Sequence, residues 1–245
     1  MIGVILRKEL ALLARSPATW LVLAILLFLL AWQFIGRIDP WLALQPELAK
    51  RAAAPGVTES LIAPAFNATA WAILLLAPLF AMRLLSEEKR QRTLPLLTSA
   101  PISPWQIVLG KFFALLLALC VVTAFSFTLA LSLRLGGALD WGLILSNFIG
   151  LILFAAMLAA FSLFVSALSP YPLMAAMAAL LLLLLAAFAP GMASEAKSLA
   201  LISPLYHFEP FNLGVLDASA SLYFVLLTGS FLWLAVAALE RAKRY

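Results

Sequence analysis

Charged residues and cysteine are scarce in this sequence. Only 11% of the 245 residues are charged, whereas about a quarter are charged in a typical soluble domain. Hydrophobic residues make up 65%. A soluble protein of this size could not bury so many apolar side chains, because much of a small protein lies at its surface. The composition therefore excludes a soluble globular domain and indicates a polytopic membrane protein.

Two residue types that occur once narrow the chemistry further. Cys120 is the one cysteine, which excludes an internal disulfide and a cysteine metal cluster. His207 is the one histidine, so we expect a structural hydrogen bond there rather than a catalytic or metal-binding role. The sequence contains no Gly-x-x-x-x-Gly-Lys-Ser/Thr phosphate loop. We therefore expect no catalytic residue, cofactor or metal in this chain, and no ATP hydrolysis by it.

Long apolar runs occur six times. A membrane-spanning helix needs about 20 such residues, and a charge at its centre costs roughly 2.5–3.5 kcal/mol on the insertion scale. None of the six runs contains a charged residue. We expect one all-α transmembrane domain over residues 1–245, with spans at about 17–35, 61–82, 112–133, 143–168, 173–189 and 222–239.

Lysine and arginine are concentrated on one side of this predicted topology. Most lie before the first span, between residues 83 and 111, and after the last span. Because cytoplasmic segments are enriched in these residues, both termini are predicted to be cytoplasmic. The basic residues do not alternate with aromatics along a face, as they would in a nucleic-acid binder. We expect the lipid bilayer as a partner and no nucleic acid.

Residues 1–16 have the pattern of an amphipathic helix. Its apolar face is formed by Ile2, Leu6, Leu10 and Leu13, and its basic residues are Arg7, Lys8 and Arg15. This pattern is typical of an interfacial helix that lies on the inner leaflet. The alternative is a basic flank that only fixes the topology.

The segment from residue 83 to 111 is predicted to protrude into the cytoplasm. Its acidic residues precede its basic ones, an order that suits a helix dipole, in the cluster Glu87, Glu88, Lys89, Arg90 and Arg92. A short apolar patch follows at Leu94, Leu96 and Leu97 and ends before Pro101 and Pro104. The pattern suits a helical elbow that docks another protein, although by composition alone a solvated charged loop between two spans is favoured.

The segment from residue 190 to 221 is too short and too polar to cross the membrane, although apolar residues recur in it. We predict short amphipathic or re-entrant helices on the outer side, broken by Pro190, Pro204 and Pro210. Such backbone is tolerated near a bilayer where protein covers it.

The elbow resembles the signature of type-2 ABC permeases, the membrane subunits of a class of ATP-driven transporters. The matching residues are Glu87, Glu88, Lys89, Thr93, Leu94, Leu96, Leu97, Pro101, Ile102, Ser103, Trp105, Gly110 and Lys111. The chain departs from this signature at Arg92, where the family favours glycine, and at Pro95, where it favours glutamate.

Residues 203–224 resemble the outer segment of two groups within that family. These are the gliding-motility-type (GldF-like) permeases and the nitrous-oxide-reductase-maturation (NosY-like) permeases. The matching residues are His207, Phe208, Gly214, Val215, Asp217, Leu222 and Tyr223.

The resemblance implies a permease subunit in a bacterial inner membrane. A partner ABC ATPase subunit would hold ATP and Mg, and its hydrolysis would drive export or extraction of a substrate. The coupling helix that contacts this ATPase would include Glu87, Glu88, Lys89, Arg90, Arg92, Thr93, Leu94, Leu96 and Leu97. Further implied partners are a second permease copy or a paralogue and an auxiliary membrane or periplasmic subunit.

Two other functions remain open on the sequence. One is a membrane scaffold or assembly factor that organises an envelope complex without transport of its own. The other is an integral membrane enzyme, which would usually place paired ionisable groups within the bilayer. The six runs contain no such pair, so the enzyme is ranked last.

Overall fold

The computed structural model describes residues 1–48, 56–91, 103–136, 139–192 and 201–243. Within these ranges the chain is helical and has no strand. Six helices are long and apolar enough to cross a membrane, which confirms the predicted all-α architecture with six spans. They are α2 (Pro17–Leu48), α3 (Ala63–Ala81), α6 (Pro104–Ser132), α7 (Trp141–Leu168), α8 (Pro172–Met192) and α11 (Ala218–Lys243).

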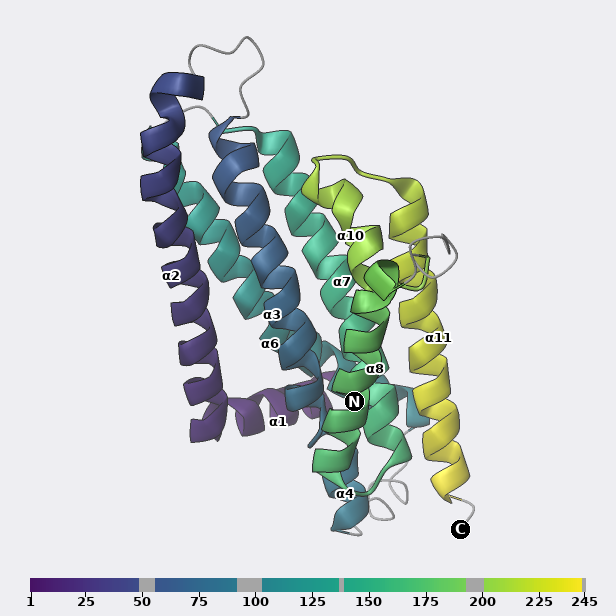
Figure 1. The fold of residues 1–245 in the computed structure, drawn as a ribbon. Helices are drawn as coiled ribbons and strands as arrows, with labels where there is room; N and C mark the ends of the chain where they lie inside the picture. The colour runs from purple at the N-terminus through teal and green to yellow at the C-terminus, as the bar shows by residue number, and fades with distance from the viewer. Residues whose placement is uncertain (49–55, 92–102, 137–138, 193–200, 244–245) are drawn as a thin grey trace.

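Short elements connect the spans at both ends of the bundle. Helix α1 (Ile2–Arg15) lies across the lower end in Figure 1, and α4 (Ser86–Arg90) lies beside it below α3. We call this end, which also holds the carboxy end of α11, the α4 end. The opposite end, the α10 end, carries α10 (Pro204–Asn212), a π-helical turn η1 (Thr58–Ile62) and a 3-10 turn η2 (Leu133–Gly136).

The spans divide into an inner and an outer group. More than half of the most apolar stretch is buried in α3, α6 and α7, but less than a third is buried in α2, α8 and α11. The core therefore forms between α3, α6 and α7, with α11 packed along α7. The outer helices turn large apolar side chains away from the core, and lipid or a partner subunit can cover them.

Several helices extend beyond the predicted spans. Helix α2 continues to Leu48 instead of ending near residue 35, and it contains Pro40. Helix α6 begins at Pro104, eight residues before the predicted span, which starts at about residue 112. Helix α8 continues past Pro190 to Met192, where a break was expected. Hydropathy marks the part of a helix that fits the bilayer, and proline is tolerated in such helices when neighbouring groups satisfy the freed carbonyl.

The α10 end differs in part from the predicted set of broken helices. Pro204 begins α10 instead of ending a helix, because its missing N–H is not needed in the first turn. Pro210 lies inside the last turn and does not break it. Ser203, just before the helix, accepts a hydrogen bond from the Tyr206 N–H through its side chain.

A glycine lets α10 pack closely on α7. A Cβ added to Gly150 would lie 2.6 Å from the Cβ and Cγ of Phe211. The Phe211 ring is fully buried and adjoins an aromatic cluster with Phe154, Phe208 and Phe224. Only a residue without a side chain at position 150 leaves room for this contact.

Gly150→Ala tests this packing. The new methyl group would overpack the α7–α10 contact, which typically costs about 1–3 kcal/mol. Gly229→Ala in α11 is the matched control, because nothing lies within 4 Å of its added Cβ and alanine favours a helix. In thermal unfolding in detergent, the melting temperature of Gly150→Ala should lie below that of the wild type, and that of Gly229→Ala should equal or exceed it. Equal melting temperatures for the two variants would contradict the close contact.

Candidate functional site

Lys111 is the centre of a buried ionic cluster at the α4 end. Its side chain is 1% exposed. Its Nζ donates to Glu9 Oε1 of α1 at 2.8 Å, to Glu88 Oε1 of α4 at 2.8 Å and to the Leu84 carbonyl at 2.6 Å. An ammonium group has three N–H donors, so all of them are used. One side chain thus joins α1, α4 and the segment after α3 to α6.

Two local features of α6 place Lys111. Ser103 and Gln106 form a reciprocal capping box that begins the helix two turns before Lys111. A Cβ added to Gly110 would lie 2.8 Å from Ile5 of α1, so this glycine allows α1 to cross α6 at close range. Glu9 is one turn beyond Ile5 on the same face of α1 and is buried there. The close crossing brings the two opposite charges together.

The cluster is nearly balanced in charge. Two carboxylates surround Lys111, and Lys8 adds a second cation at 3.8 Å from Glu9 and 3.6 Å from Glu88. The Lys8 side chain is 53% exposed, so water screens its contribution. Lys111, in contrast, would be an uncompensated buried charge without both carboxylates. The arrangement requires α1 and α4 to remain in place around α6.

The opposite side of α4 is bonded to the end of α7. Ser166 Oγ accepts hydrogen bonds from the backbone N–H groups of Leu85 and Ser86 at 3.3 and 3.2 Å. Ser86 Oγ donates to the Ser166 carbonyl at 2.8 Å, and Lys89 Nζ donates to the Ala167 carbonyl. The last carbonyls of a helix lack partners within it and attract cations, so Lys89 suits this position. Helix α4 is therefore held from two sides.

The outward face of α4 carries a separate pair. Arg90 donates to Glu87 Oε1 at 2.7 Å, and the Gln91 side chain donates to the same oxygen at 2.7 Å. This pair is partly exposed, and neither residue contacts Lys111. Exposed ion pairs contribute little to stability. Glu87 and Arg90 are thus accessible to a partner without any change in the buried cluster.

The residues predicted on the other side of the membrane gather around α10. The His207 ring stacks on Tyr223 with centroids 3.8 Å apart, and its Nε2 lies 3.0 Å from the Leu201 carbonyl oxygen. Phe208 is buried against Phe154. Gly214 has φ of 84°, a left-handed conformation that favours glycine, and lies against Leu143.

Asp217 stands just before α11 and caps it. Its carboxylate accepts hydrogen bonds from the backbone N–H groups of Ser219 and Ala220, both at 3.2 Å, and from the Ser219 hydroxyl. The Ser219 hydroxyl hydrogen bond, supported by the backbone ones, holds the pKa of this carboxyl below its usual value. Asp217 therefore fixes the start of the last span, and His207 fixes the chain before α10.

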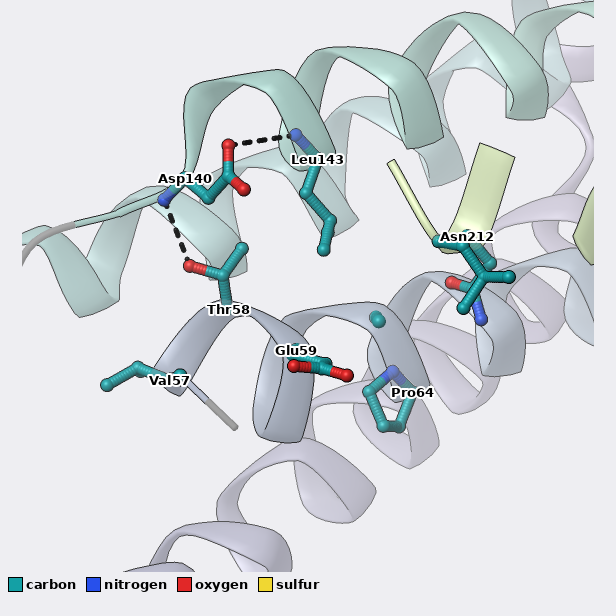
Figure 2. A pocket seen from close by; sticks show the side chains of 10 residues that line it. Val57, Thr58, Glu59, Pro64, Asp140, Leu143 and Asn212 are labelled. Carbon is teal, nitrogen blue, oxygen red and sulfur yellow. Dashed lines mark hydrogen bonds between the residues drawn. The ribbon is translucent and has the colours of Figure 1, made fainter. Parts of the chain in front are cut away.

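A pocket of about 570 Å³ lies at the α10 end between η1 and the start of α7 (Figure 2). The Asp140 N–H donates to Thr58 Oγ1 at 3.0 Å, and the Asp140 carboxylate caps α7 through Gly142 and Leu143. Glu59, Pro64 and Asn212 also line it. The Asp140 carboxylate is already hydrogen-bonded to the start of α7, so this pocket is a weaker candidate for a functional site than the ionic cluster.

Comparison with known families shows to which family the chain belongs. The model of the family described as ABC-2 family transporter protein matches residues 4–238. The chain belongs to this ABC-2 transporter family. No curated protein matches it at a significant level. Membership makes the chain a transmembrane permease component of an ABC transporter and implies an ABC ATPase subunit as its partner.

The structure of this ABC-2 protein brings some of the predicted site residues together and leaves others apart. Glu88 and Lys89 bond to Lys111 and to the end of α7, whereas Glu87 and Arg90 form a partly exposed pair with each other. Arg7, Lys8 and Arg15 lie exposed along α1. The predicted residues Arg92, Thr93, Leu94, Leu96 and Leu97 lie outside the described residues.

Sequence reasoning missed Glu9 and Ser166 and treated Lys111 only as a motif match. A signal for Glu9 was present, because a glutamate interrupts the apolar face of a helix whose neighbours there are hydrophobic. No sequence pattern pointed to Ser166.

Lys111→Met tests the buried cluster of this ABC-2 protein. The variant leaves Glu9 and Glu88 buried without their cation, and breaking such a pair typically costs about 3–5 kcal/mol. Lys8→Met is the matched control, because its exposed ion pairs are worth about 0–1 kcal/mol. Thermal unfolding in detergent should show a large loss for Lys111→Met and a small one for Lys8→Met. Equal, small losses would mean that Lys111 does not hold the helices together.

Ser166→Ala tests the other attachment of α4. It removes the acceptor of the Leu85 and Ser86 N–H groups, and an unsatisfied buried donor typically costs about 1–3 kcal/mol. Ser162→Ala, one turn earlier on α7, is the control, because the buried Ser162 hydroxyl has no partner among the described residues. Hydrogen exchange at α4 should rise in Ser166→Ala and stay unchanged in Ser162→Ala. Unchanged exchange in both would argue against the attachment.

Proposed function

We propose that this permease transmits the movements of a partner ATPase to its spans through α4. ATP and Mg bind the partner, and the chain itself contributes no catalytic residue. The observation that carries the proposal is the double attachment of α4, to α1 and α6 through Lys111 and to α7 through Ser86, Lys89 and Ser166. A force applied to α4 would therefore act directly on these helices.

The proposal includes the direction of the chain in the membrane. The α4 end lies on the cytoplasmic side of a bacterial inner membrane, where it can meet an ATPase, and the basic residues of α1, α4 and the tail support this orientation. Helix α1 lies crosswise to the spans and carries Arg7, Lys8 and Arg15 on its exposed surface, which fits a helix in the membrane interface. The α10 end then faces outward.

We further propose that two permease chains, identical or paralogous, form the membrane unit. The poorly buried apolar faces of α2, α8 and α11 supply surface for such a contact and for an auxiliary subunit. The substrate is exported, or extracted from the outer leaflet. The features around α10 support a place near the GldF-like and NosY-like permeases, with His207, Phe208, Gly214 and Asp217 shaping the outer segment.

Coupled ATP hydrolysis tests this function. The permease and its ATPase are reconstituted together, and stimulation of hydrolysis is measured for a double variant with Glu87→Ala and Arg90→Ala, which removes the exposed pair of α4 but none of the contacts of Lys111. We expect stimulation to fall about tenfold or more, since lost ionic contacts at an interface cost several kcal/mol. Arg134→Ala, at the α10 end, is the control and should behave as the wild type.

Two results would contradict the proposal. If the double variant assembles with the ATPase and stimulates it as the wild type does, α4 is not the contact. If the complex hydrolyses ATP under permease control but no compound moves across reconstituted vesicles, the chain acts as a scaffold without transport.

A further inference from the structure

A cavity of about 750 Å³ lies at the α4 end, beside the ionic cluster. It is lined by α1, the start of α2, the end of α3, the segment through α4, and Lys111 of α6. Glu87, Glu88 and Lys111 line it, so it adjoins the residues of the proposed coupling function, which assigns no ligand to it. This inference rests on the proposed function in one respect: with α1 in the membrane interface, the cavity lies at the depth of lipid headgroups and the first part of their acyl chains.

One part of the cavity wall is apolar. Leu12 and Leu13 come from α1, Val22 from α2, and Leu79 and Phe80 from the last turn of α3. Helix α2 is the least buried of the six spans within the chain, so the cavity is bounded on that side by a helix at the edge of the bundle. An apolar hollow of this kind beside a bilayer suits a hydrocarbon chain better than water.

The other part of the wall carries positive charge that is available to a ligand. Arg83 is exposed, and its guanidinium makes no hydrogen bond or ion pair with any other described residue, although Glu87 is near enough to attract it. The Lys8 Nζ forms only long ion pairs, at 3.8 Å from Glu9 Oε1 and 3.6 Å from Glu88 Oε1.

The three carboxylates that line the cavity already have closer cations or donors. Glu9 and Glu88 each accept from Lys111 at 2.8 Å, and Glu87 accepts from Arg90 and Gln91 at 2.7 Å. An anionic group between Arg83 and Lys8 would therefore meet cations rather than unpaired carboxylates.

We propose that this cavity binds one anionic phospholipid from the leaflet next to α1. One acyl chain lies between Val22 of α2 and Leu79 and Phe80 of α3, and the phosphate lies against Arg83 and Lys8. Arginine binds phosphate oxygens through paired N–H donors, and basic side chains at a membrane surface attract anionic lipids. The lipid would connect α1, α2 and the segment leading into α4, and so support the helix that the proposed function uses.

Native mass spectrometry of the full chain tests the site without any ATPase, so its outcome is independent of the proposed function. The protein is titrated in micelles with dioleoylphosphatidylglycerol or with dioleoylphosphatidylcholine. Two variants change the site: Arg83→Gln removes the exposed charge, and Val22→Trp fills the apolar part. Arg134→Gln, an exposed arginine at the α10 end, and Leu21→Trp, one position along α2 with an exposed side chain, are the matched controls.

The wild type should retain one phosphatidylglycerol with an affinity about tenfold or more above that for phosphatidylcholine, as expected for a charge-assisted contact. Arg83→Gln should lose this preference, Val22→Trp should bind neither lipid at this site, and both controls should match the wild type. Melting temperatures confirm that each variant is folded.

Three results would overturn the proposal. The first is equal retention of the two lipids by the wild type, which would mean that headgroup charge plays no part. The second is equal loss in Arg83→Gln and Arg134→Gln, which would show only general surface attraction. The third is full displacement of the lipid by soluble glycerol phosphate, which would show that the acyl chain does not occupy the cavity.

Discussion

The burial of one lysine constrains the whole α4 end. Lys111 lies inside α6 with almost no exposed surface, and a charge in such surroundings is tolerated only when it is paired and hydrogen-bonded. Glu9 and Glu88 supply that pairing from helices 102 and 23 residues away in the chain. Helix α1 and helix α4 therefore have defined positions, although neither is long enough to be stable by itself.

The same constraint connects the surface of the bundle to its centre. Helix α4 is bonded to α7 through Ser86 and Ser166, and α7 lies against α3, α6 and α11 in the core. At its far end α7 meets α10 through the close contact of Gly150 and Phe211. A displacement of α4 can therefore pass through direct contacts to α1, α6 and α7. Continuity of packing is a structural condition for coupling, and coupling itself is shown only by a change that both ends respond to.

Much of the fold was predictable because it depends on composition and length. Six charge-free apolar runs predict six spans, and the spacing of Ile2, Leu6, Leu10 and Leu13 predicts the helix before them. Helix ends were less predictable, since α2 continues through Pro40 after hydropathy falls. The pairing of Glu9 with Lys111 was not predictable, because it depends on how α1 crosses α6 at Gly110. Periodicity gives the face of a helix but not the partner it meets.

The central claim is that α4 and α1 move as one unit because Lys111 joins them. Pulsed electron paramagnetic resonance tests this most directly, with spin labels at Gln91→Cys at the end of α4 and Arg15→Cys on α1 in a Cys120→Ala background. In the complex with the ATPase, the distance between the labels should stay the same with and without bound nucleotide. The distribution of this distance should broaden when Lys111→Met is added. A distance that changes with nucleotide in the protein with Lys111 intact would contradict the account.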